Sequence, residues 1–192
     1  YVTYFGSLFE IGSENRKATE LMTEEVDRVN RVISELLEFA RPSDLKLKKI
    51  NVSELIDHSL RIITHEAETA GVIISKTITD DLPEVDADID RLTQVLLNLY
   101  LNALQAMNGG GKLTVEAKHE ERKLVIDIAD SGIGIPEELI SQIFDPYFTT
   151  KNSGTGLGLA IAHKIVESHN GAIEVRSTQG SGTLISVTLP IS

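Results

Sequence analysis

The sequence predicts an α+β protein in which a helical hairpin precedes a two-layer α/β sandwich. A heptad pattern of apolar residues runs through residues 14–41 and stops at Pro42. Beyond Pro42, helix-like patterns alternate with strand-like runs, and two late pairs of runs are each joined by a short turn. Short turns join antiparallel strands, and helices mixed with such strands favour a two-layer sandwich.

The first predicted element is a long helix over residues 14–41. Six of its apolar residues are spaced alternately four and three apart, as in the seam of a helical bundle: Met22, Val26, Val29, Ile33, Leu36 and Ala40. An ordinary amphipathic helix is the alternative. Apolar residues between Val2 and Phe9 resemble the end of another helix, so we expect a hairpin whose first arm is cut short. Proline cannot continue a helix, and we therefore expect two domains, 1–44 and 45–192.

The second domain alternates strands and helices. Strands are predicted for the following apolar runs: 45–52, 72–79, 112–119, 123–130, 171–178 and 182–190. A helix that Ser53 can cap is predicted to run to about Ala70, and a longer helix follows residues 86–90. Turns near residues 120 and 180 predict two hairpins.

Composition narrows the range of partners. The chain has 192 residues and a net charge of −11, which argues against nucleic acid or an anionic membrane surface as a main partner. An anionic ligand would therefore need local dipoles, a metal or a few cationic residues. Cysteine is absent, which excludes disulfides, and no apolar run reaches the ~18 residues of a membrane span. The chain does not begin with Met, so we expect it to be part of a longer protein.

Residues 90–107 form an apolar helix with one narrow polar stripe. The stripe follows offsets of 0, 3, 7, 11 and 14, which is one face of an α-helix: Arg91, Gln94, Asn98, Asn102 and Gln105. A buried helix with amides at its solvent edge is one interpretation. The other is a row of neutral oxygens lining a ligand pocket. Asparagine oxygens suit Mg²⁺, and a neutral ligand avoids repelling a polyphosphate.

Three further segments carry possible ligand chemistry. Asp130 ends a strand and begins D-S-G-I-G, which predicts either a simple turn or a carboxylate that accepts from an exocyclic amine such as that of adenine. Residues 143–156 combine aromatics with turn residues, as in a lid, and Lys151 within it is either a surface lysine or a cation for a terminal phosphate. The third segment places Gly154, Gly156 and Gly158 before a helix, which predicts close packing or an anion site.

The order of these segments resembles a known family. The amide-striped helix, D-S-G-I-G, the aromatic loop and G-T-G-L-G-L resemble the N, G1, F and G2 boxes of the sensor histidine kinases, whose ATP-binding domain belongs to the superfamily of gyrase and Hsp90. The resemblance covers residues 15–190, and residues 179–183 look like the last glycine box. The sequences of residues 94–106 and 146–160 are similar to those of the nitrogen-regulator and zinc-responsive envelope-stress kinases. The implied fold is the Bergerat ATP-binding sandwich, preceded in the sequence by a truncated helical hairpin that forms part of a dimeric four-helix bundle.

The resemblance also implies a site for ATP and Mg²⁺. By this resemblance the nucleotide-binding residues are Asn98, Asn102, Asp130, Gly132, Gly134, Phe144, Lys151, Gly154, Thr155, Gly156, Leu157, Gly158 and Thr183. Asn102 matches the Mg²⁺ ligand, and Asp130 matches the residue that reads adenine, with support from Thr183. Asn98 and Lys151 are the expected catalytic residues.

As a family member, the chain is expected to transfer the γ-phosphate of ATP to a histidine, from which it passes to a response regulator aspartate. We expect a homodimer through the N-terminal hairpin. The implied location is the cytoplasmic domain of a bacterial inner-membrane protein, touching membrane only through parts outside this chain. Nucleic acid is not an expected partner.

One departure from the family concerns the phosphoacceptor. The family carries it in an H-E-x-x-N-P box, and none of the five histidines lies in such a box: His58, His65, His119, His163 and His169. A hydrolytic clamp of the same superfamily is the main alternative function, and a nucleotide-binding regulator without catalysis is another. Hydrolytic relatives place a glutamate four residues before the Mg²⁺-binding asparagine to activate water. Here that residue is Asn98, which favours a kinase.

Overall fold

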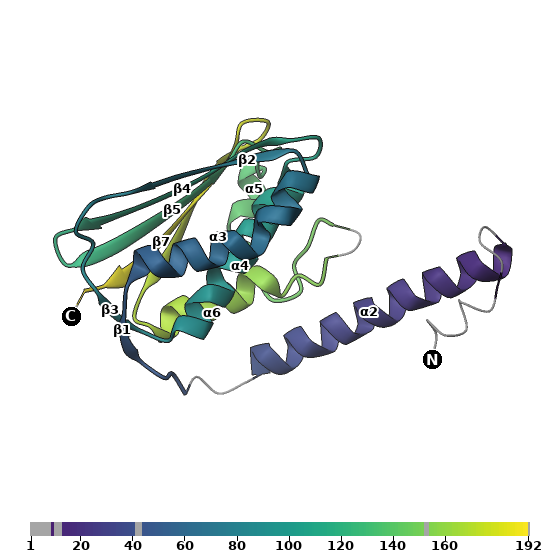
Figure 1. Cartoon of the computed structure of the whole chain (residues 1–192), viewed down its shortest axis with the longest axis horizontal. Helices are drawn as coiled ribbons and strands as arrows, with labels where there is room; N and C mark the ends of the chain where they lie inside the picture. Colours follow the sequence, from purple (N-terminus) through teal and green to yellow (C-terminus); the bar gives the residue numbers. More distant parts are fainter. Residues whose placement is uncertain (1–8, 10–12, 41–43, 152–153, 192) are drawn as a thin grey trace. The chain divides into compact units, whose positions relative to one another are not determined.

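The computed structural model describes residues 9, 13–40, 44–151 and 154–191. Contacts divide the chain into two compact units, Tyr1–Arg41 and Pro42–Ser192 (Figure 1). The sequence pattern places the boundary three residues later, after Asp44. The expected first arm of the hairpin, from Val2 to Phe9, lies outside the described residues except for Phe9.

The first unit contains helix α2, Glu14–Ala40, as the heptad pattern predicts. Ser13 caps its start, because the Arg16 backbone N–H donates to Ser13 Oγ at 3.2 Å. The seam side chains of this helix remain exposed, from 42% for Leu36 to 61% for Met22. A stripe of large apolar side chains left in water indicates a surface made for a partner.

The second unit contains a mixed five-stranded sheet in the order β2-β4-β5-β7-β6. The strands are β2 (Val72–Ile78), β4 (Gly111–Glu120), β5 (Lys123–Asp130), β6 (Ala172–Thr178) and β7 (Gly182–Pro190). Only β2 and β4 pair in parallel, whereas the three other neighbouring pairs are antiparallel. Both predicted hairpins are present, with Glu121 in the left-handed region at the first turn and Gly180 at the second.

Three long helices, α3 (Val52–Thr69), α4 (Ile89–Ala106) and α6 (Gly158–Ser168), lie against one face of this sheet (Figure 1). Alternate residues of β7 supply part of the core, and Ile185, Val187 and Leu189 are buried. The predicted two-layer α/β sandwich is confirmed. Among the described helices, none is long and apolar enough to cross a membrane.

Two small elements were not predicted, and one predicted cap is wrong. Strand β3 (Val85–Ala87) pairs antiparallel with β1 (Lys48–Ile50), and α5 (Glu137–Ile140) is a single turn. Helix α3 is capped by Asn51 rather than Ser53. The Asn51 Oδ1 accepts from the backbone N–H groups of Ser53 and Glu54, so Ser53 already lies inside the first helical turn.

Candidate functional site

The polar stripe of α4 forms one wall of the candidate site. The opposite side of α4 is buried and carries Leu92, Leu96 and Leu99. Asn98 Nδ2 donates to the backbone oxygen of Gly158 at 3.0 Å, and Asn102 Nδ2 donates to the backbone oxygen of Asn98 at 2.9 Å. Because both amide nitrogens are committed, the side-chain oxygens are the atoms that these asparagines can offer to a cation.

Lys151 lies against this stripe although 46 residues separate it from Gln105. Its Nζ is 3.0 Å from Asn102 Oδ1 and 2.6 Å from Gln105 Oε1. Protein atoms around the ammonium lower the pKa of Lys151 through desolvation, and the Asp130 carboxylate acts in the opposite direction. The two amide oxygens therefore already hold a cation.

Asp130 lies at the end of β5, where it is paired in register with Thr183 on β7. Its Oδ1 accepts the backbone N–H of Gly132 at 2.8 Å. Burial raises the pKa of Asp130, against the opposing effects of hydrogen bonds from Gly132 and Thr183 and of the Lys151 charge. A half-buried carboxylate at the end of a strand can accept a further hydrogen bond from a donor group of a ligand.

The glycines after Asp130 are required by contacts between backbone segments. A Cβ at Gly132 would lie 2.6 Å from the backbone oxygen of Ala106, at the end of α4. Gly134 has a φ of +65°, and a Cβ there would collide with the backbone of Thr178 on β6. The described contacts therefore assign these glycines to close packing of the loop against α4 and the β6–β7 hairpin.

Thr183 is buried and belongs to a small hydroxyl network. Ser177 Oγ donates to the backbone oxygen of Gly182 at 2.9 Å and accepts the backbone N–H of Ile135 at 2.8 Å. The hydroxyls of Ser177 and Thr183 are 2.9 Å apart. Because the Ser177 proton is already used, Thr183 donates to Ser177 and can accept from a ligand or water.

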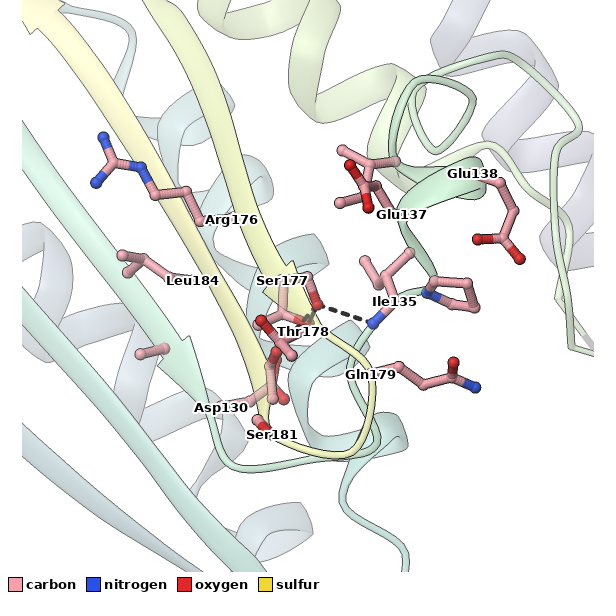
Figure 2. A pocket seen from close by; sticks show the side chains of 15 residues that line it. Asp130, Ile135, Glu137, Glu138, Arg176, Ser177, Thr178, Gln179, Ser181 and Leu184 are labelled. Atoms are coloured by element: carbon pink, nitrogen blue, oxygen red, sulfur yellow. Dashed lines mark hydrogen bonds between the residues drawn. The ribbon is translucent and has the colours of Figure 1, made fainter.

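A cavity of about 790 Å³ opens beside this network, between the ends of the strands and α5 (Figure 2). Asp130 and Thr183 line it together with Ser177 and Ile135, whereas the asparagines of α4 and Lys151 do not. The predicted residues thus form two groups, one at the strand ends and one on α4. The Lys151 charge acts to lower the pKa of Asp130, although burial outweighs it.

The aromatic loop is fixed to α6 by Phe144. The Phe144 ring lies 5.0 Å from the His163 ring, measured between centroids. Gly156 has a φ of +71°, and its oxygen accepts the Tyr147 backbone N–H at 3.0 Å. The ring contact connects Phe144 to α6, and the bond between Tyr147 and Gly156 joins two parts of the loop itself.

The glycine segment leads directly into α6. Thr155 Oγ1 accepts the backbone N–H of Leu157 at 3.3 Å, and Leu157 is fully buried. Gly158 begins the helix, and a Cβ there would lie 3.8 Å from the Asn98 side chain. A Cβ at Gly154 would lie 2.5 Å from Thr149 Oγ1. The G2-type glycines therefore bring the start of α6 close to the stripe.

His169 is a structural residue. It is 5% exposed, and its Nε2 accepts the backbone N–H of Asp88 at 3.0 Å. Its Nδ1 is 2.8 Å from the backbone oxygen of Ile165 and carries the proton, because Nε2 is an acceptor. With both nitrogens engaged and the ring buried, His169 cannot receive a phosphoryl group.

Two residues of the site were missed by reasoning from the sequence. Gln105 was recognised as part of the stripe but not as a partner of Lys151, and Ser177 was not singled out at all. The stripe was a usable signal for Gln105. Ser177 is one alternating residue of an ordinary strand, so no local pattern distinguishes it.

Comparison with known proteins agrees with the motifs. The family model described as histidine kinase-, DNA gyrase B-, and HSP90-like ATPase matches residues 87–192. Sensor histidine kinase ZraS of Escherichia coli K12 is 45% identical over 189 residues, which is 98% of this chain and 41% of ZraS. The chain thus spans about two-fifths of that relative.

Solved structures show the same fold. The nucleotide-free catalytic domain of histidine kinase ThkA is 32% identical with a TM-score of 0.70, covering 76% of this chain and 95% of that one. ThkA in complex with response regulator protein TrrA is 26% identical with a TM-score of 0.81, covering all of this chain and 55% of ThkA.

Proposed function

The chain belongs to the family of histidine kinase-, DNA gyrase B- and HSP90-like ATPases, and we propose that it is the ATP-binding portion of a sensor histidine kinase. In this proposal it binds Mg–ATP and transfers the γ-phosphate to a histidine. The accepting histidine belongs to an acceptor box, and none of the histidines of this chain lies in such a box. The phosphoryl group then passes to an aspartate of a response regulator. The ZraS and ThkA relatives are named as histidine kinases, which supports the proposal.

The observation that carries the proposal is the cation already held by the stripe. Asn102 and Gln105 present neutral oxygens to the Lys151 ammonium at 3.0 and 2.6 Å. Hard cations such as Mg²⁺ bind to oxygens of this kind, so the donor set fits the metal, with Asn102 as the proposed ligand. Mg²⁺, when bound, would neutralise negative charge on the phosphates of the nucleotide.

Recognition of adenine is assigned to the strand ends. Asp130 offers a carboxylate oxygen to the exocyclic amine, and Thr183 can accept through its hydroxyl, directly or through water. Guanine places an oxygen where adenine has the amine, so the carboxylate would face an acceptor. The site should therefore prefer ATP to GTP.

Asn98 and Lys151 are the proposed catalytic residues. Phosphoryl transfer depends mainly on positioning and electrostatic stabilisation, and the two residues serve these needs in different ways. Asn98 connects the stripe to the start of α6 through its bond to Gly158. Lys151 supplies a positive charge to the terminal phosphate in a chain whose net charge is −11.

The hydrolytic alternative is less well supported because Asn98 cannot act as a base. Its amide nitrogen donates to Gly158 and its oxygen has almost no affinity for a proton. A carboxylate at this place would be needed to activate water. We therefore propose a kinase rather than an ATPase clamp.

The proposed assembly is a homodimer through the N-terminal hairpin. The exposed seam of α2 offers the apolar surface, and two hairpins would complete a four-helix bundle. A receiver domain of a response regulator is the proposed second partner, because the related kinase ThkA has been solved in complex with the response regulator protein TrrA. The proposed location is the cytoplasmic side of a bacterial inner membrane, with any membrane segment outside this chain.

The proposal is tested by phosphate labelling. Incubated with radiolabelled ATP, this chain should remain unlabelled, because its histidines lie outside an acceptor box. A longer chain that includes the acceptor helix but carries Asn102→Ala should be unable to label itself. If transfer occurs between subunits, the longer chain should become labelled in heterodimers with the present chain. If transfer occurs within one subunit, the longer chain should become labelled only after Asn102 is restored.

Two results would contradict the proposal. Acid-labile phosphate on the present chain would place the acceptor at an exposed histidine such as His65 or His119. Steady release of inorganic phosphate without labelling of the restored longer chain would favour the ATPase clamp.

A further inference from the structure

Gln105 is a residue of the stripe that contacts Lys151 but has no role in the proposed function. It lies three residues after Asn102 on α4, and its Oε1 is the nearer of the two oxygens to Lys151 Nζ, at 2.6 Å against 3.0 Å. Side chains three residues apart lie next to one another on a helix. Asn102 Oδ1 and Gln105 Oε1 therefore form a two-oxygen binding site for one ammonium, here called the seat.

The seat connects two parts of the chain that are distant in sequence. Lys151 ends the stretch from Asp145, here called the 145–151 loop, while Gln105 and Asn102 belong to α4. Hydrogen bonds between a charged donor and a neutral acceptor are stronger than bonds between neutral groups. The bond from Lys151 thus fastens the loop to α4, whereas the backbone N–H groups of Tyr147 and Phe148 donate to Gly156 and Asp145 and do not reach that helix.

We infer that Gln105 is a positioning residue that keeps the Lys151 ammonium on the Asn102 oxygen until Mg–ATP binds. The inference rests on the proposed function, in which that same oxygen is the Mg²⁺ ligand. An ammonium and a metal ion cannot both occupy the neighbourhood of one amide oxygen without strong repulsion. Binding of Mg–ATP therefore requires Lys151 to leave Asn102, and Gln105 determines how readily it leaves.

Competition of this kind makes a prediction opposite to that of a simple ligand contact. If Gln105 held the nucleotide or the metal directly, its removal would weaken Mg–ATP binding. If Gln105 instead stabilises the unliganded arrangement, its removal weakens the competitor and Mg–ATP binds more readily. The effect should also depend on Lys151, because without the ammonium there is nothing for Gln105 to hold.

The experiment compares Gln105→Ala with the unmodified chain in two measurements. Without nucleotide, amide hydrogen exchange in the 145–151 loop should become about threefold to tenfold faster, the range for losing one hydrogen bond whose charged donor remains exposed to water. At fixed ATP, the Mg²⁺ concentration for half-saturation should fall by about the same factor. Both effects should vanish in a Lys151→Met background, which is the double-mutant test of coupling.

Gln142→Ala is the matched control. Gln142 is an exposed glutamine outside the stripe, whose side chain donates to the backbone oxygen of Glu138 at 3.4 Å. It should alter neither measurement. Equal thermal melting of all variants confirms that they fold.

Three outcomes would count against the inference. Unchanged exchange in the 145–151 loop, with normal Mg–ATP binding, would overturn the inference and leave the proposed function intact. A higher Mg²⁺ requirement that persists in the Lys151→Met background would make Gln105 a direct ligand contact. Failure of the unmodified chain to bind Mg–ATP would refute the proposed function, and the inference together with it.

Discussion

Asp130 shows at the scale of one residue how position decides what a carboxylate can recognise. One of its oxygens accepts from Gly132, and the residue is half-buried at the end of a strand. Water competes poorly for the remaining oxygen in such a place, so a ligand amine gains more from it than from an exposed carboxylate.

We predict that Asp130→Asn removes the preference for ATP over GTP. The amide can present N–H groups where adenine needs an acceptor, and the loss of one bond to a charged group should weaken ATP binding about tenfold to a hundredfold. Calorimetric titration with both nucleotides measures this. Asp127→Asn, on the same strand but turned to the other face of the sheet, is the control. Equal, weak binding of ATP and GTP by the unmodified chain would show that Asp130 does not read the base.

Burial of the Tyr100 side chain makes the free energy of unfolding depend on pH. Tyr100 is fully buried in α4, and among the described residues its hydroxyl has no hydrogen-bond partner of acceptable geometry. Burial raises the pKa of Tyr100 to about 12, although the nearby Ser59 hydroxyl lowers it somewhat. The folded protein therefore keeps a proton that the unfolded chain releases near pH 10.

We predict that the unmodified chain loses stability between pH 10 and pH 12 through Tyr100, and that Tyr100→Phe does not share this part of the loss. Unfolding then releases a proton, so the free energy of unfolding falls as pH rises. A difference of two pKa units corresponds to a loss of about 2 kcal/mol by pH 12. At pH 7 the variant should be at least as stable, because the lost hydroxyl had no good partner. Urea unfolding from pH 7 to 11.5 tests this, and parallel curves for the two proteins would contradict it.

Asp88 organises three elements at once. Its Oδ1 accepts from the backbone of Asp90 and Arg91 at the start of α4, and its Oδ2 accepts from the backbone of Lys46 at 2.9 Å. Its own backbone N–H donates to His169 at the end of α6. One residue thus fixes the segment before β1 and two ends of the helices that carry the stripe and the glycines.

We predict that Asp88→Ala lowers the free energy of unfolding by about 1–3 kcal/mol, because it removes a cap and leaves the Lys46 N–H without its acceptor. Asp88→Asn should cost less, since asparagine also caps helices. Urea unfolding at pH 7 measures both, with exposed Asp90→Asn as the control.

The pH dependence of this interaction has a defined sign. Burial by itself raises the pKa of Asp88, but the three backbone donors and His169 outweigh it, so the pKa is lowered on folding. The stabilisation is therefore present above the ordinary carboxyl range and is lost as the pH falls below it. The difference between the unmodified chain and Asp88→Ala should shrink on acidification, and a constant difference would disprove this assignment.

At the scale of the whole molecule, the candidate site and the exposed apolar seam belong to different units. The second unit has its own core and contains every residue of the candidate site, whereas α2 leaves its apolar seam exposed. A 27-residue helix with this surface gains little stability alone and needs partner helices. Nucleotide binding and self-association should therefore be separable.

We predict that residues 45–192 form a folded monomer that binds ATP as tightly as the whole chain, while the whole chain is a dimer. Light scattering during gel filtration gives the masses, and calorimetry gives the affinities. Val29→Glu in the whole chain should also shift the mass toward the monomer, because it places a charge in the seam, and Val29→Leu is its control. A dimer of residues 45–192 would move the interface into the second unit.

Local pattern was sufficient for much of the fold and part of the site. The spacing of apolar residues predicted α2, α4 and both hairpins, since helix and strand periodicities depend only on neighbours along the chain. The same rule placed Asn98, Asn102 and Gln105 on one face of α4. Turn chemistry identified the glycine loop and the end of β5. These features are properties of short segments and can be recognised without knowing what the segments contact.

Tertiary structure decided what no local pattern contains. The parallel pairing of β2 with β4 and the bond between Asp88 and His169 join segments distant in sequence, 81 residues apart in the second case. Likewise, the close approach of Gly134 to the backbone of Thr178 on β6 is a contact that the sequence does not reveal. Gln105 acquired a partner only because folding brought Lys151 to α4. Such contacts depend on how layers pack, which follows from the core of the whole domain rather than from any segment of it.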